Sequence, residues 1–169
     1  MTDRWRGRRR AGLAAVVLTA AVLAGTAATT ALAAPRWIVI RDAAGVELAR
    51  AALPTSGTFS LRYRNSLYGS TVEERFRAEG DHLAQVSLAA EELAVLEEYY
   101  GAAGATHIDA SAGLGWQVDI DRPPVALPLR VQATALGERE LITEGGTLSL
   151  WRLVAGHDST RVVLTVEDG

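Results

Sequence analysis

The chain has 169 residues, no cysteine and no lysine, and all 17 of its basic residues are arginine. The lack of cysteine excludes disulfides, thiolate metal sites and a cysteine nucleophile. Residues 34–169 carry 12 arginines against 19 acidic residues, a net charge of −7. This charge argues against binding to nucleic acid or to an anionic lipid surface.

The first 33 residues have the order of an export segment. A basic start at residues 4–10 precedes an apolar run at residues 11–24 and the small-residue sequence ALA at residues 31–33. We expect a signal peptide or membrane anchor over residues 1–33 and one extracytoplasmic domain, secreted or anchored, over residues 34–169. The anchor is an open alternative because residues 11–34 nearly reach the ~20 apolar residues of a bilayer span. If uncleaved, they would be the domain's membrane contact.

Short alternating segments follow, punctuated by glycine, proline and aspartate, which is typical of an antiparallel sheet protein. The predicted strands are Arg36–Arg41, Val46–Leu53, Thr58–Arg64, Val72–Ala78, His82–Ala90, Trp116–Asp121, Leu127–Leu136, Thr147–Val154 and Val162–Glu167. Residues 91–100 fit a helix and a strand equally well, and residues 101–115 predict a loop. The expected fold is all-β: a single antiparallel sandwich or partly open barrel of about eight or nine strands, after an N-terminal hydrophobic export helix.

Glu74 departs from the pattern of its strand. If residues 71–78 are extended, alternation places Glu74 on one face with Val72 and Phe76. An unpaired ionised carboxylate in an apolar interior costs several kcal/mol, whereas a whole domain is stable by only about 5–15 kcal/mol. We therefore expect compensation at Glu74.

Four arrangements could compensate this carboxylate. Glu74 could lie near water at the open end of the sheet, a bulge could turn it outward, or it could accept hydrogen bonds from hydroxyls such as those of Tyr63, Tyr99 or Tyr100. It could also pair with an arginine. Arg152 is the preferred arginine, because alternation in the predicted strand over residues 147–154 turns it inward.

The predicted hairpin of residues 58–64 and 72–78 determines the neighbours of the acidic pair. Because the apolar faces of the two strands must coincide, we expect Tyr63 near Glu74 and Arg64 near Glu73. A buried pair of Glu74 with Arg152 would be purely structural. A Glu74 in a half-open mouth beside Asn65, Ser66 and the tyrosines would instead be a binding site.

The standard catalytic spacings are absent from the sequence: no nucleophile elbow, no His-Glu-x-x-His, no phosphate-binding glycine loop and no EF-hand loop. His107 and Asp109 have metal-ligand spacing, but a solvated loop is the favoured interpretation. We expect neither a metal site nor a cofactor, and a protein that is not an enzyme. The alternatives are a hydrolase with Glu74 as general base and a purely structural envelope domain.

Three short motifs resemble a known family. They are Asn65-Ser66, the sequence TVEERF at residues 71–76 and YGA at residues 100–102, and together they resemble the small exported bacterial family termed domain of unknown function 1850. The family pattern has histidine where this chain has Asn65. The resemblance covers residues 58–103 and implies an exported β-rich domain, encoded near tripartite ATP-independent transporters, with Ser66, Glu73 and Glu74 as the motif positions.

The leading hypothesis is a non-enzymatic accessory domain that binds a small polar solute. Its partner would be a membrane transporter or the transporter's solute-binding protein. The candidate binding residues are Tyr63, Asn65, Ser66, Glu73, Glu74, Tyr99, Tyr100 and Arg152.

Overall fold

The computed structural model describes residues 34–109 and 113–169, so the predicted export segment lies outside the described residues. The strands are β1 (Arg36–Arg41), β2 (Glu47–Leu53), β3 (Thr58–Arg64), β4 (Thr71–Glu79), β5 (His82–Ala90), β6 (Thr106–His107), β7 (Trp116–Asp119), β8 (Val125–Ala126), β9 (Leu129–Gln132), β10 (Glu140–Thr143), β11 (Gly146–Ser149) and β12 (Arg161–Asp168). Two short helices accompany them, the π-helix η1 (Val95–Tyr99) and α1 (Leu150–Leu153). No helix in the described ranges has the length and apolar character needed to cross a bilayer.

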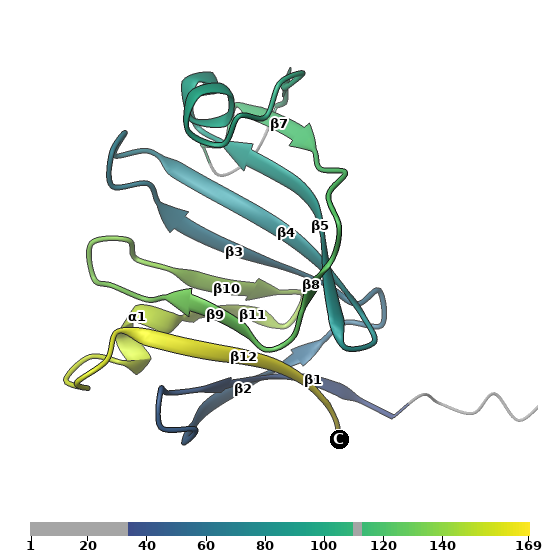
Figure 1. Ribbon diagram of the computed structural model, residues 1–169, viewed down its shortest axis with the longest axis vertical. Helices are drawn as coiled ribbons and strands as arrows, with labels where there is room; N and C mark the ends of the chain where they lie inside the picture. The colour runs from purple at the N-terminus through teal and green to yellow at the C-terminus, as the bar shows by residue number, and fades with distance from the viewer. Residues whose placement is uncertain (1–33, 110–112) are drawn as a thin grey trace, which may run out of the picture. The chain divides into compact units, whose positions relative to one another are not determined.

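The strands form two antiparallel sheets (Figure 1). Sheet A has the order β2-β1-β12-β9, and sheet B has the order β11-β10-β3-β4-β5-β7-β6, with β8 paired to β5. Neither sheet closes on itself within the described residues. The predicted all-β antiparallel class is therefore confirmed.

One face of sheet B, here termed the inner face, carries two hydrophobic clusters. In cluster 1, Leu61 and Phe76 of sheet B pack with Ile40 and other apolar side chains of sheet A. In cluster 2, Leu88 of sheet B packs with Leu96 of η1. Full burial of one such side chain contributes about 1.5–3 kcal/mol to stability. Burial on the inner face is therefore the main source of the stabilising free energy.

The opposite, outer face of sheet B is polar. Arg62 on β3 lies directly opposite Glu73 on β4 and directly opposite Glu140 on β10. Because side chains alternate along a strand, these charges lie on the other side of the sheet from the apolar residues of cluster 1. A charged row thus crosses three neighbouring strands.

The predicted strand over residues 147–154 is wrong in its second half. Strand β11 ends at Ser149, and Leu150–Leu153 form α1. Helical spacing buries Leu150 and Val154, four residues apart, in cluster 1. That burial turns Arg152 outward, where it is exposed.

Further segments were ambiguous in the sequence or were not predicted from it. Residues 91–100 include the helical turn η1, which buries Val95 and Leu96 and exposes Glu97 and Glu98. The strand β10 at residues 140–143 was not predicted, because a four-residue segment shows too little alternation. Sheet B therefore contains β10, and also the two-residue strands β6 and β8, which the sequence pattern did not reveal.

Candidate functional site

Glu74 lies where the two hydrophobic clusters meet. It is opposite Leu61 of cluster 1 on β3 and opposite Leu88 of cluster 2 on β5. Its side chain is half-buried, and its Oε1 accepts a hydrogen bond of 2.7 Å from the Tyr63 hydroxyl. The predicted extended chain is confirmed, and among the four arrangements a tyrosine hydroxyl compensates the carboxylate.

A second tyrosine extends this contact into a chain. The Tyr100 hydroxyl is hydrogen-bonded to the Tyr63 hydroxyl, and because Tyr63 donates to Glu74, Tyr100 must donate to Tyr63. Burial, followed by the charge of Glu74, raises the pKa of Tyr63, and burial also raises the pKa of Tyr100. Both tyrosine hydroxyls therefore stay protonated to a higher pH than the hydroxyl of an ordinary tyrosine.

The register of the β3–β4 hairpin differs from the prediction by two residues. Tyr63 lies opposite Val72, and Arg62 rather than Arg64 lies opposite Glu73. The loop is closed by hydrogen bonds from the Asn65 amide to the Ser70 carbonyl at 2.9 Å and from the Gly69 amide to the Asn65 carbonyl at 2.7 Å. An even shift preserves the faces, so Tyr63 still reaches Glu74 diagonally.

Asn65 and Ser66 do not contribute to a shared mouth. Asn65 is 4% exposed, and its Oδ1 accepts hydrogen bonds from the backbone amides of Leu67 at 2.9 Å and Tyr68 at 3.2 Å. This is an Asx turn, so the side chain stabilises the loop. Ser66 is exposed on the same loop.

The remaining predicted residues are divided between the faces. Tyr99 is 55% exposed and lies edge-on to Tyr100, with ring centroids 4.9 Å apart. Glu73 is on the outer face, where it is 8% exposed and lies 2.7 Å from Arg62 and 3.6 Å from Arg75. The structure therefore groups Tyr63, Glu74, Tyr99 and Tyr100 and separates Glu73 from them.

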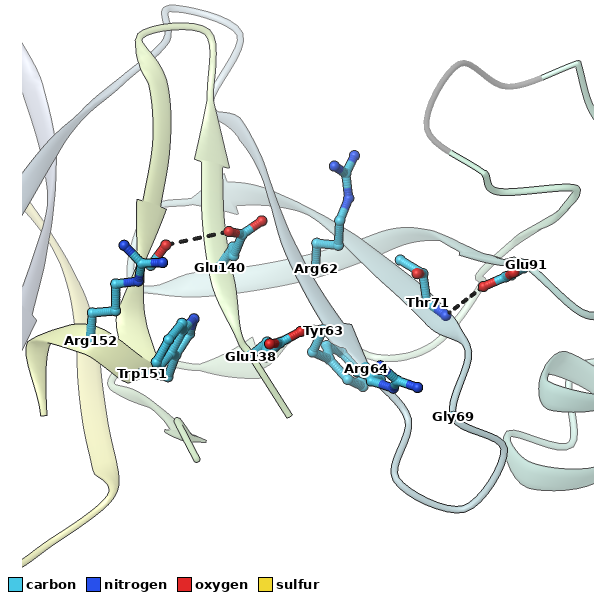
Figure 2. Close-up of a pocket in the computed structure, with 11 residues that line it drawn as sticks. Arg62, Tyr63, Arg64, Gly69, Thr71, Glu91, Glu138, Glu140, Trp151 and Arg152 are labelled. Atoms are coloured by element: carbon cyan, nitrogen blue, oxygen red, sulfur yellow. Dashed lines mark hydrogen bonds between the residues drawn. The ribbon is translucent and has the colours of Figure 1, made fainter. Parts of the chain in front are cut away.

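The preferred pairing of Glu74 with Arg152 is wrong. Arg152 lies in α1, and its guanidinium carbon is 4.9 Å from the centroid of the Trp151 ring. Figure 2 shows Arg152 beside Trp151, across from Glu140 and Arg62, in a cavity of the outer face. Helix formation at residues 150–153 is the reason for this placement.

That cavity, here termed the Arg62 cavity, has a volume of about 420 Å³. Its charged and aromatic lining consists of Arg62, Tyr63, Arg64, Glu91, Glu138, Glu140, Trp151 and Arg152. Two adjoining hollows of about 210 and 310 Å³ share Arg62, Glu73 and Arg75. The volume falls within the range of about 300–1,000 Å³ that small-ligand sites occupy.

Contacts within the lining orient several of these groups. Arg62 Nη2 donates to Glu73 at 2.7 Å, although Glu140 lies opposite it on the other side. Glu140 instead accepts a hydrogen bond of 3.3 Å from Ser149 Oγ, and Glu91 accepts one of 3.2 Å from the Thr71 amide (Figure 2). The pairing of β3 with β10 and the ion pair of Arg62 with Glu73 thus hold these lining residues in place.

The β9–β10 loop carries Glu138 to the cavity. Glu138 has a φ of 45°, and it is the one non-glycine residue in the described ranges with a positive φ. Its amide donates to the Thr134 carbonyl at 3.0 Å, and the Gly137 carbonyl accepts from the Arg64 amide at 2.8 Å. The left-handed conformation costs roughly 1–2 kcal/mol, so the surrounding hydrogen bonds must hold it.

A metal site receives no support from the described residues. They contain no group of three or more side chains able to ligate a metal ion. His107 is exposed and packs edge-on against Trp116, with ring centroids 5.2 Å apart. His107 is therefore exposed, as predicted, but it lies in β6, which pairs with β7, and not in a loop.

Sequence reasoning missed most of the Arg62 cavity. Arg62 and Arg64 looked like members of a solvated polar face, and nothing in the sequence joined them to Glu138 or Glu140. A prediction of β10 would have placed Glu140 beside Arg62, but that strand is short and non-local. The sequence pattern of β10 was therefore too weak to predict the cavity.

Comparisons of this chain with protein-family models, with curated proteins and with solved structures give no match. The resemblance to the exported bacterial family stays a prediction. The geometry of the inner and outer faces is what supports a functional proposal.

Proposed function

We propose that this chain is a non-enzymatic binding domain that holds a small polar solute in the Arg62 cavity. The observation that carries the proposal is a cavity of ligand size whose lining is charged and comes from several separate elements. A purely structural envelope domain has no need of such a hollow.

Support for binding comes from the preorganisation of the cavity. Arg62 is held by Glu73, which is itself buried between Arg62 and Arg75. A guanidinium that is already fixed loses less conformational freedom when a ligand arrives. Arg152 is held over the indole of Trp151, a cation–π arrangement that limits its motion.

We further propose that the domain acts outside the cytoplasm as an accessory to a tripartite ATP-independent transporter. The order of the first 33 residues and the family resemblance support this location and partner. A fusion of residues 1–33 to a reporter that is active only outside the cytoplasm tests export. Co-purification with the transporter's solute-binding protein from the same genome tests the partner.

A hydrolase with Glu74 as general base is the less favoured function. The hydrogen-bond partner of Glu74 in the described residues is Tyr63, whose raised pKa keeps its hydroxyl protonated and unreactive as a nucleophile. A general base also requires an activated water beside it. The tyrosine occupies one carboxylate oxygen instead.

The proposal is tested by thermal unfolding of the full chain in mild detergent. The panel contains amino acids, carboxylates, sugars and divalent cations. A true ligand at 100 times its dissociation constant adds about 2.7 kcal/mol of stability. Arg152→Gln should reduce the shift, whereas Arg77→Gln, on the exposed part of β4 outside the cavity lining, should retain it. If no solute shifts the wild-type transition, the proposal is wrong.

A further inference from the structure

The charges that line the Arg62 cavity are balanced. Three guanidinium groups, from Arg62, Arg64 and Arg152, face three carboxylates, from Glu91, Glu138 and Glu140. This balance contrasts with the net charge of −7 over residues 34–169. A ligand with a single sign of charge would be repelled by half of the lining.

Contacts within the protein occupy only some of the charged groups in this lining. Arg62 is paired with Glu73, and Glu91 accepts the Thr71 amide. Within residues 34–109 and 113–169, neither Arg64 nor Arg152 forms an ion pair. Two cations therefore still offer their donors to a ligand.

Carboxylates remain open in the same cavity. Among the described residues, the Glu140 carboxylate accepts a hydrogen bond only from the Ser149 hydroxyl, at 3.3 Å, and no cation pairs with Glu138 or Glu140. Figure 2 shows the two carboxylates between Arg152 on one side and Arg62 with Arg64 on the other. Anion-binding and cation-binding groups thus alternate across the hollow.

Gly69 lies beside Arg64 in the lining of the cavity. A β-carbon built on Gly69 would lie 3.6 Å from Arg64 Nη2, and Gly69 has a φ of 71°. That distance is an ordinary van der Waals contact, so the positive φ and not the space beside Arg64 is what favours glycine here.

We infer that the solute of the Arg62 cavity is a small zwitterion that carries both a carboxylate and an ammonium group. Arg152 binds the carboxylate, since its planar guanidinium donors match the two oxygens, whereas Arg64 lies on the other side of Glu138 and Glu140 (Figure 2). Glu138 and Glu140 accept hydrogen bonds from the ammonium group. This inference rests on the proposed binding function and adds to it the chemical class of the ligand.

The test compares four small probes by titration calorimetry on the full chain in mild detergent. They are 4-aminobutanoate as zwitterion, butanoate as anion, butylamine as cation and glucose as neutral solute, together with a panel of the common amino acids. We expect at least one zwitterion to bind tenfold or more tightly than butanoate, butylamine and glucose.

Replacing one charged lining residue by glutamine should weaken binding of the zwitterion and strengthen binding of one singly charged probe. Glu140→Gln should weaken the zwitterion at least fivefold and strengthen butanoate, because it removes a repulsion. Arg152→Gln should weaken the zwitterion and strengthen butylamine. Arg77→Gln is the matched control and should alter none of these affinities. A general loss of structure would weaken every probe alike, and that result would contradict the assignment of these residues.

The outcomes separate this inference from the proposed function. Binding of glucose, butanoate or butylamine at least as tight as that of every zwitterion overturns the zwitterion and leaves solute binding intact. Absence of binding by every probe and every solute of the thermal panel overturns both.

Discussion

Glu73 and Glu74 are consecutive in the chain, and their carboxylates serve opposite faces of sheet B. Glu73 accepts from Arg62 on the polar outer face, and Glu74 accepts from Tyr63 on the apolar inner face. Their roles are therefore separable: Glu73 orients a guanidinium of the cavity, whereas Glu74 anchors a tyrosine between two hydrophobic clusters.

Tyr63→Phe should lower the free energy of unfolding by about 1–3 kcal/mol, because the half-buried Glu74 loses its hydrogen-bond donor. Urea denaturation measures the change. Tyr99→Phe is the control: its ring is exposed, and a surface substitution of this kind changes stability by within about 0.5 kcal/mol. Equal effects of the two variants would contradict the role given to the Tyr63 hydroxyl.

A double-mutant cycle of Arg62→Gln and Glu73→Gln should show a coupling of about 1–2 kcal/mol. Glu73 is buried, although the Arg62 side chain is 31% exposed, which screens the pair in part. The pair of Arg77 with Glu79 has side chains 51% and 43% exposed and should couple by less than about 0.5 kcal/mol. Similar coupling in both pairs would show that burial of Glu73 has no energetic consequence.

Glu138→Gly should stabilise the fold by about 1 kcal/mol and weaken solute binding. Glycine adopts a φ of 45° without the steric penalty that Glu138 bears. Glu138→Ala removes the same carboxylate but keeps the penalty, so it should weaken binding without the gain in stability. Thermal unfolding and calorimetry on the two variants give both quantities, and a destabilised glycine variant would refute the strain.

Stability should fall in acid partly through Glu167. A hydrogen bond from Arg41 at 2.5 Å, then one from Thr165, lowers the pKa of this carboxyl to about 2 from its ordinary 4.5. A lowered pKa contributes stability that is complete above 4.5 and is lost as the pH falls towards 2. Urea unfolding at several pH values should therefore show a shallower acid decline for Arg41→Gln. Arg36→Gln, which removes a pair of 3.9 Å with the exposed Asp168, should leave the decline unchanged.

Stability should also fall in base through the tyrosine chain. Burial raises the pKa of Tyr63 and Tyr100, so the unfolded chain releases protons above pH 10 that the folded chain retains. The free energy of unfolding is therefore highest below pH 10 and decreases above it. The double variant of Tyr63→Phe and Tyr100→Phe should decline less steeply, as measured by urea unfolding between pH 9 and pH 11.

The inward direction of Glu74 was predictable, whereas its partner was not. Period-two alternation is local, so residues 71–79 already show which side chains share a face. The partner depends on the register with β3, which the hydrogen bonds of Asn65 in the loop determine. The preference for Arg152 failed because α1 forms where burial of Leu150 and Val154 in cluster 1 outweighs strand alternation.

An antiparallel all-β class and an inward Glu74 follow from residues read in order, because both are consequences of strand periodicity and turn composition. The Arg62 cavity does not. Arg62, Glu138 and Arg152 are remote in sequence, and the pairing of β10 with β3 and the position of α1 bring them together. The strand pairing that buries the most apolar surface over both sheets is the stable one. This total burial cannot be derived from any short stretch of sequence.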